Sequence, residues 1–590
     1  MSEYRAPIED MDFVLQHVVD VADLQDHESF AHVDPGDIAG LLEEAGRFFG
    51  EVVAPTNRAG DLQGARRNPD GSVSTPDGIP DVYRKLVGAG WAAISHDPEY
   101  GGGGFPVVIG LAIQEMLTSA NMAFSLGPLL TQGAIHALDA HGSDEQKLTY
   151  VPKLVSGEWS GTMNLTEPQA GSDVGALTTK AERRDDGSYG ITGQKIFITW
   201  GEHDCADNII HLVLARTADA PPGTKGISLF IVPKFLPNDD GTPGERNTLE
   251  CVSLEHKLGI HGSPTAVMAY EDATGYLIGE EQTGMRSMFT MMNSARLSVG
   301  LEGLALAERA YQQAVEYAHE RLQGARPGGA KGESVAIVEH PDVRRMLLTM
   351  KSQIDAMRCL CYLNAKALDD SHAASDPEVA AAGRELAEVL TPLSKAWCTD
   401  LGNELTSIGV QIHGGMGFIE ETGAAQHFRD IRIGAIYEGT NGIQAMDLVG
   451  RKLPMRDGAA IGDLLDEAEA RASDLNGGLE DLAKPMVEAV GACREAGGWL
   501  LTNMGDNALA GATPFLRLLA TTVAGSLMLK AAVAAQDELA SGASGERAEF
   551  LEQKLVSTRF FLEQIVPSAV GLLPSVMSGN DVLASYRPVL

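Results

Sequence analysis

The spacing of apolar residues changes twice along this chain, and this change constrains the fold more than any other feature of the sequence. Residues 1–158 carry apolar side chains at helical spacing, as in the stripe Ile38, Leu42 and Phe49. Residues 159–279 contain short runs rich in β-branched residues, separated by turn residues, and one such run predicts a strand at 189–199. Helical spacing returns at 280–452, where an apolar stripe between residues 343 and 357 is expected to be core. The pattern predicts a multidomain α+β protein, with an N-terminal helical domain, a middle antiparallel β-barrel or sandwich, and a C-terminal helical bundle.

A fourth segment follows the bundle. The chain has 590 residues, which is too long for a single hydrophobic core, so several domains are expected. A Lys-Leu-Pro sequence at 452–454 marks a boundary, and Leu551, Leu555 and Leu562 lie at helical spacing beyond it. Residues 453–590 therefore predict an additional helical domain. It contains no catalytic constellation, which favours a structural or interface role.

The composition excludes some classes of ligand and favours one compartment. The formal net charge of −36 argues against nucleic acid as a partner, because phosphate binding needs a basic face. The six cysteines form no CxxC pair and no zinc spacing, which predicts no metal site and a reducing cytoplasm. The N-terminus lacks the basic-then-apolar order of a signal peptide, and apolar runs such as 518–529 are too short to span a bilayer. We expect a cytoplasmic protein without a membrane span.

One acid stands out at 435–444. Glu438 lies between an apolar pair and a glycine, just before a helical pattern that Thr440 or Asn441 would cap. A carboxylate with apolar neighbours can acquire the raised pKa that a general base needs. Taken alone, an acid near a helix start more often interacts favourably with the helix dipole. Both interpretations stay open on this stretch by itself.

Three further motifs contain small residues or glycines. Thr-Glu-Pro-Gln-Ala-Gly-Ser-Asp occupies 166–173, Gly-Gln-Lys-Ile-Phe-Ile-Thr occupies 193–199, and Gln-Ile-His-Gly-Gly-Met-Gly occupies 411–417. Small residues let backbone amides approach a ligand closely. Each motif is weak evidence alone, since Gly-Ser-Asp is a common turn and an aromatic at a strand end is often core.

In this order and spacing, the motifs resemble those of the flavin-dependent acyl-CoA dehydrogenases, over about residues 40–452. The resemblance implies FAD as cofactor and Glu438 as catalytic base. It also implies two sets of binding residues. The cofactor-binding set is Met163, Leu165, Thr166, Ser172, Phe197, Thr199, Arg321, Gln411, Gly415 and Thr440, and the substrate-binding set is Ser172, Asn293, Arg296 and Gly439.

The chain also departs from the family pattern. The common Arg-x-x-Phe-Gly motif is Arg-Leu-Gln-Gly-Ala at 321–325, and a glycine-rich insertion follows it at 326–333. This departure puts one adenine-side contact to FAD in doubt. Some members carry the base on the helix of Arg296, directly before that arginine. Because Ala295 stands there, the base is expected at Glu438.

The implied reaction is α,β-desaturation of an acyl-CoA thioester to a trans-2-enoyl-CoA, as in fatty acid β-oxidation. An electron-transfer flavoprotein would accept the electrons. The segment 453–590 resembles the long subfamily, which includes broad-range fatty acyl-CoA dehydrogenases and 3-(methylthio)propanoyl-CoA dehydrogenases. The sequence leaves the choice between those substrates open. The alternatives are an acyl-CoA oxidase that uses oxygen and a catalytically silent acyl-CoA-binding or assembly protein.

The resemblance also predicts the assembly. Arg321 and Gln411 match residues that reach the FAD of a neighbouring subunit, so a monomer is not expected to hold the cofactor well. The additional domain could cover the surface through which ordinary members pair dimers into tetramers. We therefore expect a homodimer.

Overall fold

The computed structural model describes residues 4–326 and 334–588, and the chain divides into two compact units. The first unit comprises residues 1–44, 106–115 and 299–590, and the second comprises 45–105 and 116–298. The long helix α8 (Gly284–Glu320) passes from the second unit into the first.

The second unit combines a sheet with helices. Its helices are α3 (Pro55–Gln63), α4 (Ile79–Ala89), α6 (Met122–His141) and α7 (Asp144–Val155). A small hairpin joins β1 (Arg66–Arg67) and β2 (Val73–Ser74). The main strands are β3 (Trp159–Asn164), β4 (Lys180–Arg183), β5 (Tyr189–Thr199), β6 (Asn208–Ala215), β7 (Ser228–Pro233), β10 (Leu249–Leu254) and β11 (Thr265–Ile278), and β8 (Phe235–Pro237) pairs with β9 (Pro243–Arg246).

The main sheet has seven strands in the order β3-β6-β7-β11-β5-β4, with β10 also paired to β11. The long strand β11 pairs with β5 and β10 along its first part and with β7 at 276–278, so it joins two halves of the sheet. The predicted fold class is confirmed, but the sheet is open rather than a closed barrel. It also contains one parallel pair, β3 with β6. Because β3 enters from α7, it can run beside β6 in the same direction.

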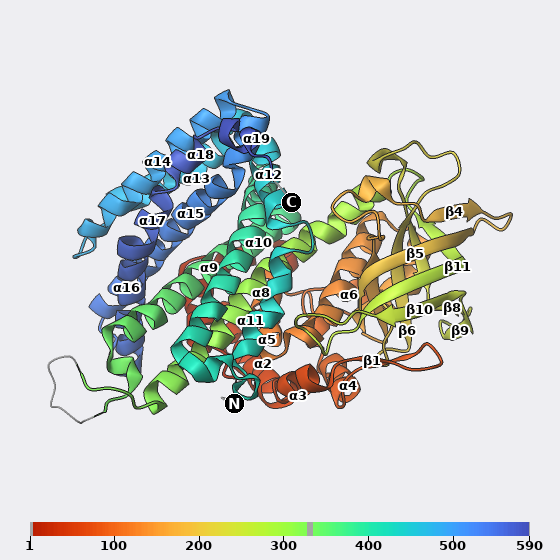
Figure 1. Cartoon of the computed structure of the whole chain (residues 1–590), viewed down its shortest axis with the longest axis horizontal. Helices are drawn as coiled ribbons and strands as arrows, with labels where there is room; N and C mark the ends of the chain where they lie inside the picture. Colours follow the sequence, from red (N-terminus) through yellow and green to blue (C-terminus); the bar gives the residue numbers. More distant parts are fainter. Residues whose placement is uncertain (1–3, 327–333, 589–590) are drawn as a thin grey trace. The chain divides into compact units, whose positions relative to one another are not determined.

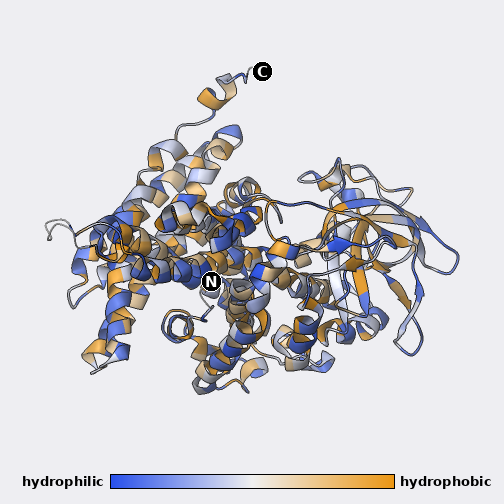
Figure 2. Ribbon diagram, turned by 60° about the horizontal axis from the view of Figure 1, so that its bottom comes forward, coloured by the Kyte–Doolittle hydropathy of each residue, from blue (hydrophilic) through white to orange (hydrophobic). Residues whose placement is uncertain are grey.

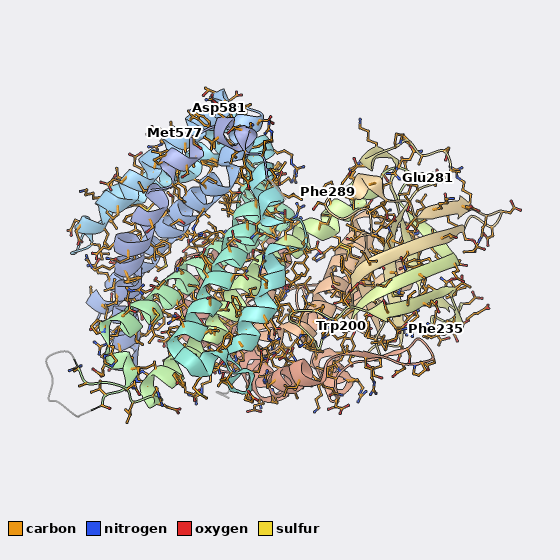
Figure 3. The ribbon with its side chains drawn as sticks, viewed as in Figure 1. Trp200, Phe235, Glu281, Phe289, Met577 and Asp581 are labelled. Atoms are coloured by element: carbon orange, nitrogen blue, oxygen red, sulfur yellow. The ribbon has the colours of Figure 1, made fainter. Side chains whose placement is uncertain are left out.

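Helix α6 packs on this sheet through small residues. A Cβ at Gly161 of β3 would lie 2.5 Å from the Cβ of Ala134, and one at Gly127 would lie 2.7 Å from the ring of Trp200. Trp200 is 1% exposed and its indole N–H donates to the carbonyl of Ala123 (Figure 3). Close packing therefore fixes the end of β5, which Trp200 follows, against α6.

The first unit is helical. Its elements before residue 453 are α1 (Ile8–His17), α2 (Pro35–Phe48), α5 (Val107–Ala120), α9 (Pro341–Ala373), α10 (Pro377–His413), α11 (Ala424–Ile431) and α12 (Asn441–Asp447). α2 and α5 also continue into the second unit. The predicted stripe on α9 is core, since Met350, Ile354 and Met357 are fully buried. The predicted stripe on α2 is likewise buried at Ile38, Leu42 and Phe49.

Glycines bring α8 and α10 into backbone contact. A Cβ at Gly303 would lie 2.1 Å from the carbonyl oxygen of Cys398, and one at Gly402 would lie 2.8 Å from the Cα of Gly303. Larger residues cannot occupy these positions without separating the helices. The crossing places the middle of α8 close to the loop that precedes α12.

The segment after residue 453 is helical, as predicted. It contains α13 (Ala459–Ser473), α14 (Ala483–Thr502), α15 (Asp506–Ala540), α16 (Glu546–Phe560), α17 (Val566–Val570), α18 (Leu573–Val576) and α19 (Asp581–Ser585). Helices α13, α14 and α15 run beside one another, and α15 contacts α9, α10 and α12 (Figure 1). By length and apolar composition α15 could cross a membrane, but 83% of its most apolar window is buried within the structure.

The first unit is not uniformly apolar inside. Hydrophilic and hydrophobic residues alternate along its helices, as Figure 2 shows. Lys351 and Lys554 form ion pairs with Asp10 and Asp355. Asp10 lies on α1, Lys351 and Asp355 lie on α9, and Lys554 lies on α16. These pairs connect α1, α9 and α16, and so tie the C-terminal segment to the rest of the unit.

Candidate active site

In the second unit, the segment after β3 is bound to the end of β5. The hydroxyl of Thr162 donates to the carbonyl of Thr199 at 2.7 Å, and the N–H of Ile196 donates to the carbonyl of Thr166 at 2.9 Å. Two motifs 30 residues apart therefore share one place in the fold. The structure brings together five predicted cofactor residues: Met163, Leu165, Thr166, Phe197 and Thr199.

A buried ion pair holds these two motifs together. Lys195 Nζ lies 2.8 Å from Glu167 Oε1 and donates to the carbonyl of Leu165 at 3.0 Å, and both charged side chains are at most 2% exposed. The carboxylate of Glu167 also accepts from the N–H groups of Thr178, at 2.7 Å, and Thr179, at 3.0 Å. Burial alone would raise the pKa of Glu167, but Lys195 and these hydrogen bonds lower it to about 2.

The backbone at Phe197 is unusual. Its φ is 61°, a left-handed conformation that a bulky residue rarely adopts, and its side chain is 58% exposed. Such strain costs on the order of 1–3 kcal/mol and persists only where the surroundings fix it, typically at a ligand site. Here the bonds of Ile196 and Thr199 supply that constraint. The result is an aromatic side chain exposed beside two threonines.

The other predicted residues of the second unit are separate from this group in sequence. Ser172 lies in an exposed loop after Glu167. Arg296 is buried in α8, 6% exposed. The neighbouring Ser294 is hydrogen bonded to His136 of α6 at 3.0 Å. The side chain of Asn293 lies outside the described residues.

In the first unit, Glu438 lies in a short loop before α12. Its φ is 55°, and Gly439 follows with a φ of 83°. Thr440 is the N-cap, and its hydroxyl accepts from the N–H of Ile443 at 3.3 Å. The sequence allowed either Thr440 or Asn441 as the cap, and the structure selects Thr440. An acid in the left-handed region is uncommon, which sets this loop apart from an ordinary helix start.

Asn441 fixes the loop to α10. Its side-chain oxygen accepts from Lys395 Nζ at 2.8 Å, while its amide donates to Asp400 Oδ1 at 2.7 Å and to the carbonyl of Ala396 at 3.1 Å. All three partners are on one helix. The start of α12 is therefore held in one orientation, directly after the residue predicted to be the base.

Tyr437 fixes the loop from the other side. Its hydroxyl donates to Glu302 Oε1 of α8 at 2.6 Å. Glu302 is completely buried, and this burial raises its pKa to about 8, with the charge of Glu438 adding to the rise. The hydrogen bond from Tyr437 and the charge of Lys395 oppose that rise.

The predicted residues for a neighbouring subunit's cofactor share one end of the first unit. Tyr317, near the end of α8, stacks on His413, at the end of α10, with ring centroids 4.5 Å apart. Arg321 follows α8 and Gln411 lies in the last turn of α10, so this stacking brings them to the same end. Both side chains are exposed, as is Gly415.

The residues present fit a bound FAD. A flavin ring has an apolar edge and a hydrogen-bonding edge, and the second unit offers an exposed aromatic, two apolar side chains and two threonine hydroxyls in one group. A diphosphate needs cationic and backbone donors, which the exposed Arg321 and the glycine turn at 414–417 supply. A Cβ at Gly415 would meet nothing within 4 Å, so that backbone is open to a ligand.

Sequence reasoning assigned no role to several residues that organise the site. Glu167 and Lys195 lie inside the motifs at 166–173 and 193–199, and this position is the one feature of the sequence that points to them. Asn441 was considered only as a helix cap. Tyr437 was considered only as an apolar neighbour of Glu438. Glu302 had no signal, because its partner is 135 residues away.

Four family models match the chain in succession. They are the N-terminal domain of acyl-CoA dehydrogenase at residues 40–158, its middle domain at 162–273, its C-terminal domain at 282–453, and an acetyl-CoA dehydrogenase C-terminal-like domain at 459–586. Together they cover most of the chain and follow the order of the helical, β and helical segments.

Individual proteins are similar over nearly the full length. The chain is 47% identical to 3-methylmercaptopropionyl-CoA dehydrogenase of Ruegeria pomeroyi, over 95% of this chain and 96% of that one. It is 33% identical to the broad-specificity linear acyl-CoA dehydrogenase of Mycobacterium tuberculosis, over 96% of each. The solved structure of an acyl-CoA dehydrogenase from Bacillus anthracis complexed with FAD has a TM-score of 0.73 and covers 98% of this chain and 96% of that one. At 20% identity, that likeness shows the fold alone.

Proposed function

The chain belongs to the acyl-CoA dehydrogenase family, and from that premise we propose that Glu438 is the base of an FAD-dependent α,β-dehydrogenation of acyl-CoA thioesters. The observation that carries this assignment is the backbone of Glu438, which two separate anchors, Tyr437 and Asn441, hold in the left-handed region. A strained acid in a doubly anchored loop is typical of a functional position.

The proposed chemistry begins with the weakly acidic α-proton of the thioester. The carboxylate of Glu438 accepts that proton. The backbone N–H of Glu438 donates to the thioester oxygen and stabilises the charge that develops there. When bound, FAD accepts the hydride from the β carbon. Exclusion of water by the bound acyl chain and flavin ring would strengthen these interactions.

The remaining site residues keep the roles that the family match implies. Phe197, Met163 and Leu165 supply the apolar contacts to the flavin, and Thr166 and Thr199 supply its hydrogen bonds. Arg321, Gln411 and Gly415 contact the FAD of the neighbouring subunit, and Thr440 contacts the cofactor beside the base. The substrate's CoA portion is bound by Ser172, Asn293 and Arg296.

For the substrate, we propose 3-(methylthio)propanoyl-CoA first and linear fatty acyl-CoA second. The 47% identity to a dehydrogenase named for the first, against 33% for one named for linear acyl-CoA, supports this order. The test is a panel of acyl-CoA thioesters with an artificial electron acceptor. A yellow protein with the highest kcat/KM on the methylthio substrate is the expected result. A colourless protein, or a yellow one inactive on every thioester, would favour the silent binding protein.

The proposed electron acceptor is an electron-transfer flavoprotein. The competing acceptor is oxygen, as in acyl-CoA oxidases. Anaerobic reduction by substrate bleaches the flavin in both cases, so the discriminating step is reoxidation. Slow return of the yellow colour in air, and fast return with an electron-transfer flavoprotein, is expected. Fast return in air would favour the oxidase.

We further propose a cytoplasmic homodimer with four successive domains, at 1–158, 159–279, 280–452 and 453–590. The family models, whose limits lie close to these, support the division. The exposed apolar residues Met416 and Phe418, the latter 86% exposed, lie beside Gln411 and support an interface there. The six free thiols suit a reducing compartment. A solution mass of four chains at micromolar concentration would contradict the dimer.

A further inference from the structure

Glu302 is a buried carboxyl group that the proposed reaction does not use. It lies on α8, one residue from the close contact between Gly303 and α10, and it is completely buried. The hydroxyl of Tyr437 donates to this carboxyl group and lies 2.6 Å from Oε1 and 2.5 Å from Oε2. A buried carboxyl group is costly unless it is hydrogen bonded, and here the donor is Tyr437, the residue next to the proposed base.

The peptide between Tyr437 and Glu438 connects this bond to the chemistry. The peptide unit is planar, so anchoring Tyr437 restricts the direction of the N–H of Glu438. That N–H is the proposed donor to the thioester oxygen. Asn441 anchors the far side of the loop to α10, but it lies three residues beyond Glu438. Of these two anchors, the Tyr437–Glu302 bond is the nearer to the catalytic group, and Gln444 of α12 adds a longer bond of 3.4 Å to the carbonyl of Glu438.

We propose that Glu302 is a positioning residue for the dehydrogenation, which acts through Tyr437 to fix the carboxylate and the N–H of Glu438. This inference rests on the proposed function, because it takes Glu438 as the base. Glu302 itself contacts neither substrate nor cofactor. The bond from Tyr437 requires only an acceptor atom, so a neutral side chain of the same shape is sufficient.

The charges around Glu302 make turnover depend on pH. Lys395 faces it from α10, and Tyr437 and Glu438 face it from the loop. With its pKa raised to about 8, Glu302 is mainly neutral at pH 7. Above that pH it becomes a second negative charge near Glu438 and opposes the negative charge that develops on the substrate. Turnover is therefore expected to fall on the alkaline side in a way that depends on Glu302.

The test compares Tyr437→Phe, Glu302→Leu and Glu302→Gln with Tyr362→Phe as the matched control. Tyr362 forms the same kind of buried bond, 2.8 Å from its hydroxyl to Glu115. That bond joins α9 to α5 and involves no residue of the loop. Two quantities are measured from pH 6 to 9.5. One is kcat with a saturating acyl-CoA, and the other is the exchange of the α-proton with deuterated solvent in a 3-thia-acyl-CoA, which has no β-hydrogen to transfer.

Tyr437→Phe and Glu302→Leu are expected to lower both kcat and the exchange rate by about 10²-fold, as misplacement of a catalytic group does, with KM within a few-fold. Glu302→Gln is expected to keep most of the activity at pH 7, because its amide oxygen accepts the same bond, and to lose the fall near pH 8. Tyr362→Phe is expected to keep the wild-type rate and profile.

The inference is overturned if Tyr437→Phe slows exchange no more than Tyr362→Phe, or if Glu302→Gln is as slow as Glu302→Leu with an unchanged profile. Glu438→Gln separates this failure from failure of the proposed function. If Glu438→Gln still exchanges the α-proton, Glu438 is not the base. If Glu438→Gln abolishes exchange while the Glu302 and Tyr437 variants behave as wild type, only the positioning role is wrong.

Discussion

At the scale of single residues, Phe197 of the second unit and Glu438 of the first have backbone conformations that a side chain disfavours. Phe197 and Glu438 both have φ between 55° and 61°. Hydrogen bonds of neighbouring residues hold both backbones, through Ile196 and Thr199 in one case and through Tyr437 in the other. The surrounding elements therefore support the strain, at two positions to which the family match assigns a ligand contact.

Glu438→Gln tests the base directly. The change keeps the size of the side chain and the backbone N–H, but it removes the basicity. We expect a yellow, folded protein that binds acyl-CoA and turns over at least ~10²–10⁴-fold more slowly. The measurement is the rate of anaerobic flavin bleaching by a saturating substrate. Bleaching within a few-fold of wild type would move the search to another acid.

Glu167→Gln tests the ion pair that joins the flavin motifs. It leaves Lys195 buried without a counter-charge, which typically costs about 3–5 kcal/mol. The folded-state pKa of Glu167 is about 2, below its ordinary 4.5, so its stabilisation is present above pH 4.5 and is lost as pH falls toward 2.

We therefore expect a lower unfolding temperature for Glu167→Gln at pH 7, and a smaller difference from wild type at pH 3. Circular dichroism melts at both pH values measure this difference. Glu182→Gln, on the exposed face of β4, is the control and should melt as wild type does. An equal melting temperature of Glu167→Gln and wild type at pH 7 would contradict the role of the pair.

At the scale of elements, the catalytic loop depends on the crossing of α8 and α10. Glu302 is next to Gly303, and the side chain of Asn441 binds four residues of α10, namely Lys395, Ala396, Thr399 and Asp400. The two helices must therefore stay in contact for both anchors to reach the loop. This contact requires a glycine at position 303, because α10 leaves no room there for a Cβ.

Gly303→Ala tests this crossing. The added Cβ would lie 2.1 Å from the carbonyl oxygen of Cys398, so the helices must separate. Overpacking of this kind costs about 1–3 kcal/mol or more. We expect a lower melting temperature and reduced kcat. Gly491→Ala on α14 is the matched control, because its Cβ meets nothing within 4 Å. It should raise stability slightly, by about 0.4–1 kcal/mol. Equal behaviour of the two variants would contradict the argument.

At the scale of the whole molecule, the segment after residue 453 is part of the first compact unit rather than an appended body. α15 contacts α9, α10 and α12, and Arg517 pairs with Glu404 of α10 at 2.6 Å. Lys554 of α16 reaches Asp10 of α1 and Asp355 of α9. Deletion of 455–590 would therefore expose apolar faces of α9 and α10, and we expect aggregation or higher assembly.

Lys554→Met is a milder test of the same connection. It removes one cation from a buried group that contains two aspartates, which leaves their charge incompletely paired. We expect a loss of stability of about 3–5 kcal/mol, seen as a lower midpoint in denaturant, with kcat of the folded enzyme unchanged. The control is Lys484→Met, whose lysine side chain is 82% exposed. Selective loss of kcat without loss of stability would mean that the segment helps form the site.

The sequence by itself determined the class of elements, the family and the residues inside its motifs. The strand at 189–199 was predicted with its observed bounds, because alternation and flanking turns are local signals. The helix stripes on α2 and α9 were predicted for the same reason. The proposal that Glu438 is the base came from a local pattern, an acid between apolar residues and a glycine, together with the family match.

Only the tertiary structure decided how those residues are held. The parallel pairing of β3 with β6, the Lys195–Glu167 pair, the Gly303 crossing and the bond from Tyr437 to Glu302 all join residues far apart in sequence. No local pattern specifies which distant partner a buried polar group finds, because burial and chain topology set that choice together. Glu302 is the clearest case. In the sequence it is one acid in a long helix, and in the fold it accepts a hydrogen bond from Tyr437, the residue before Glu438.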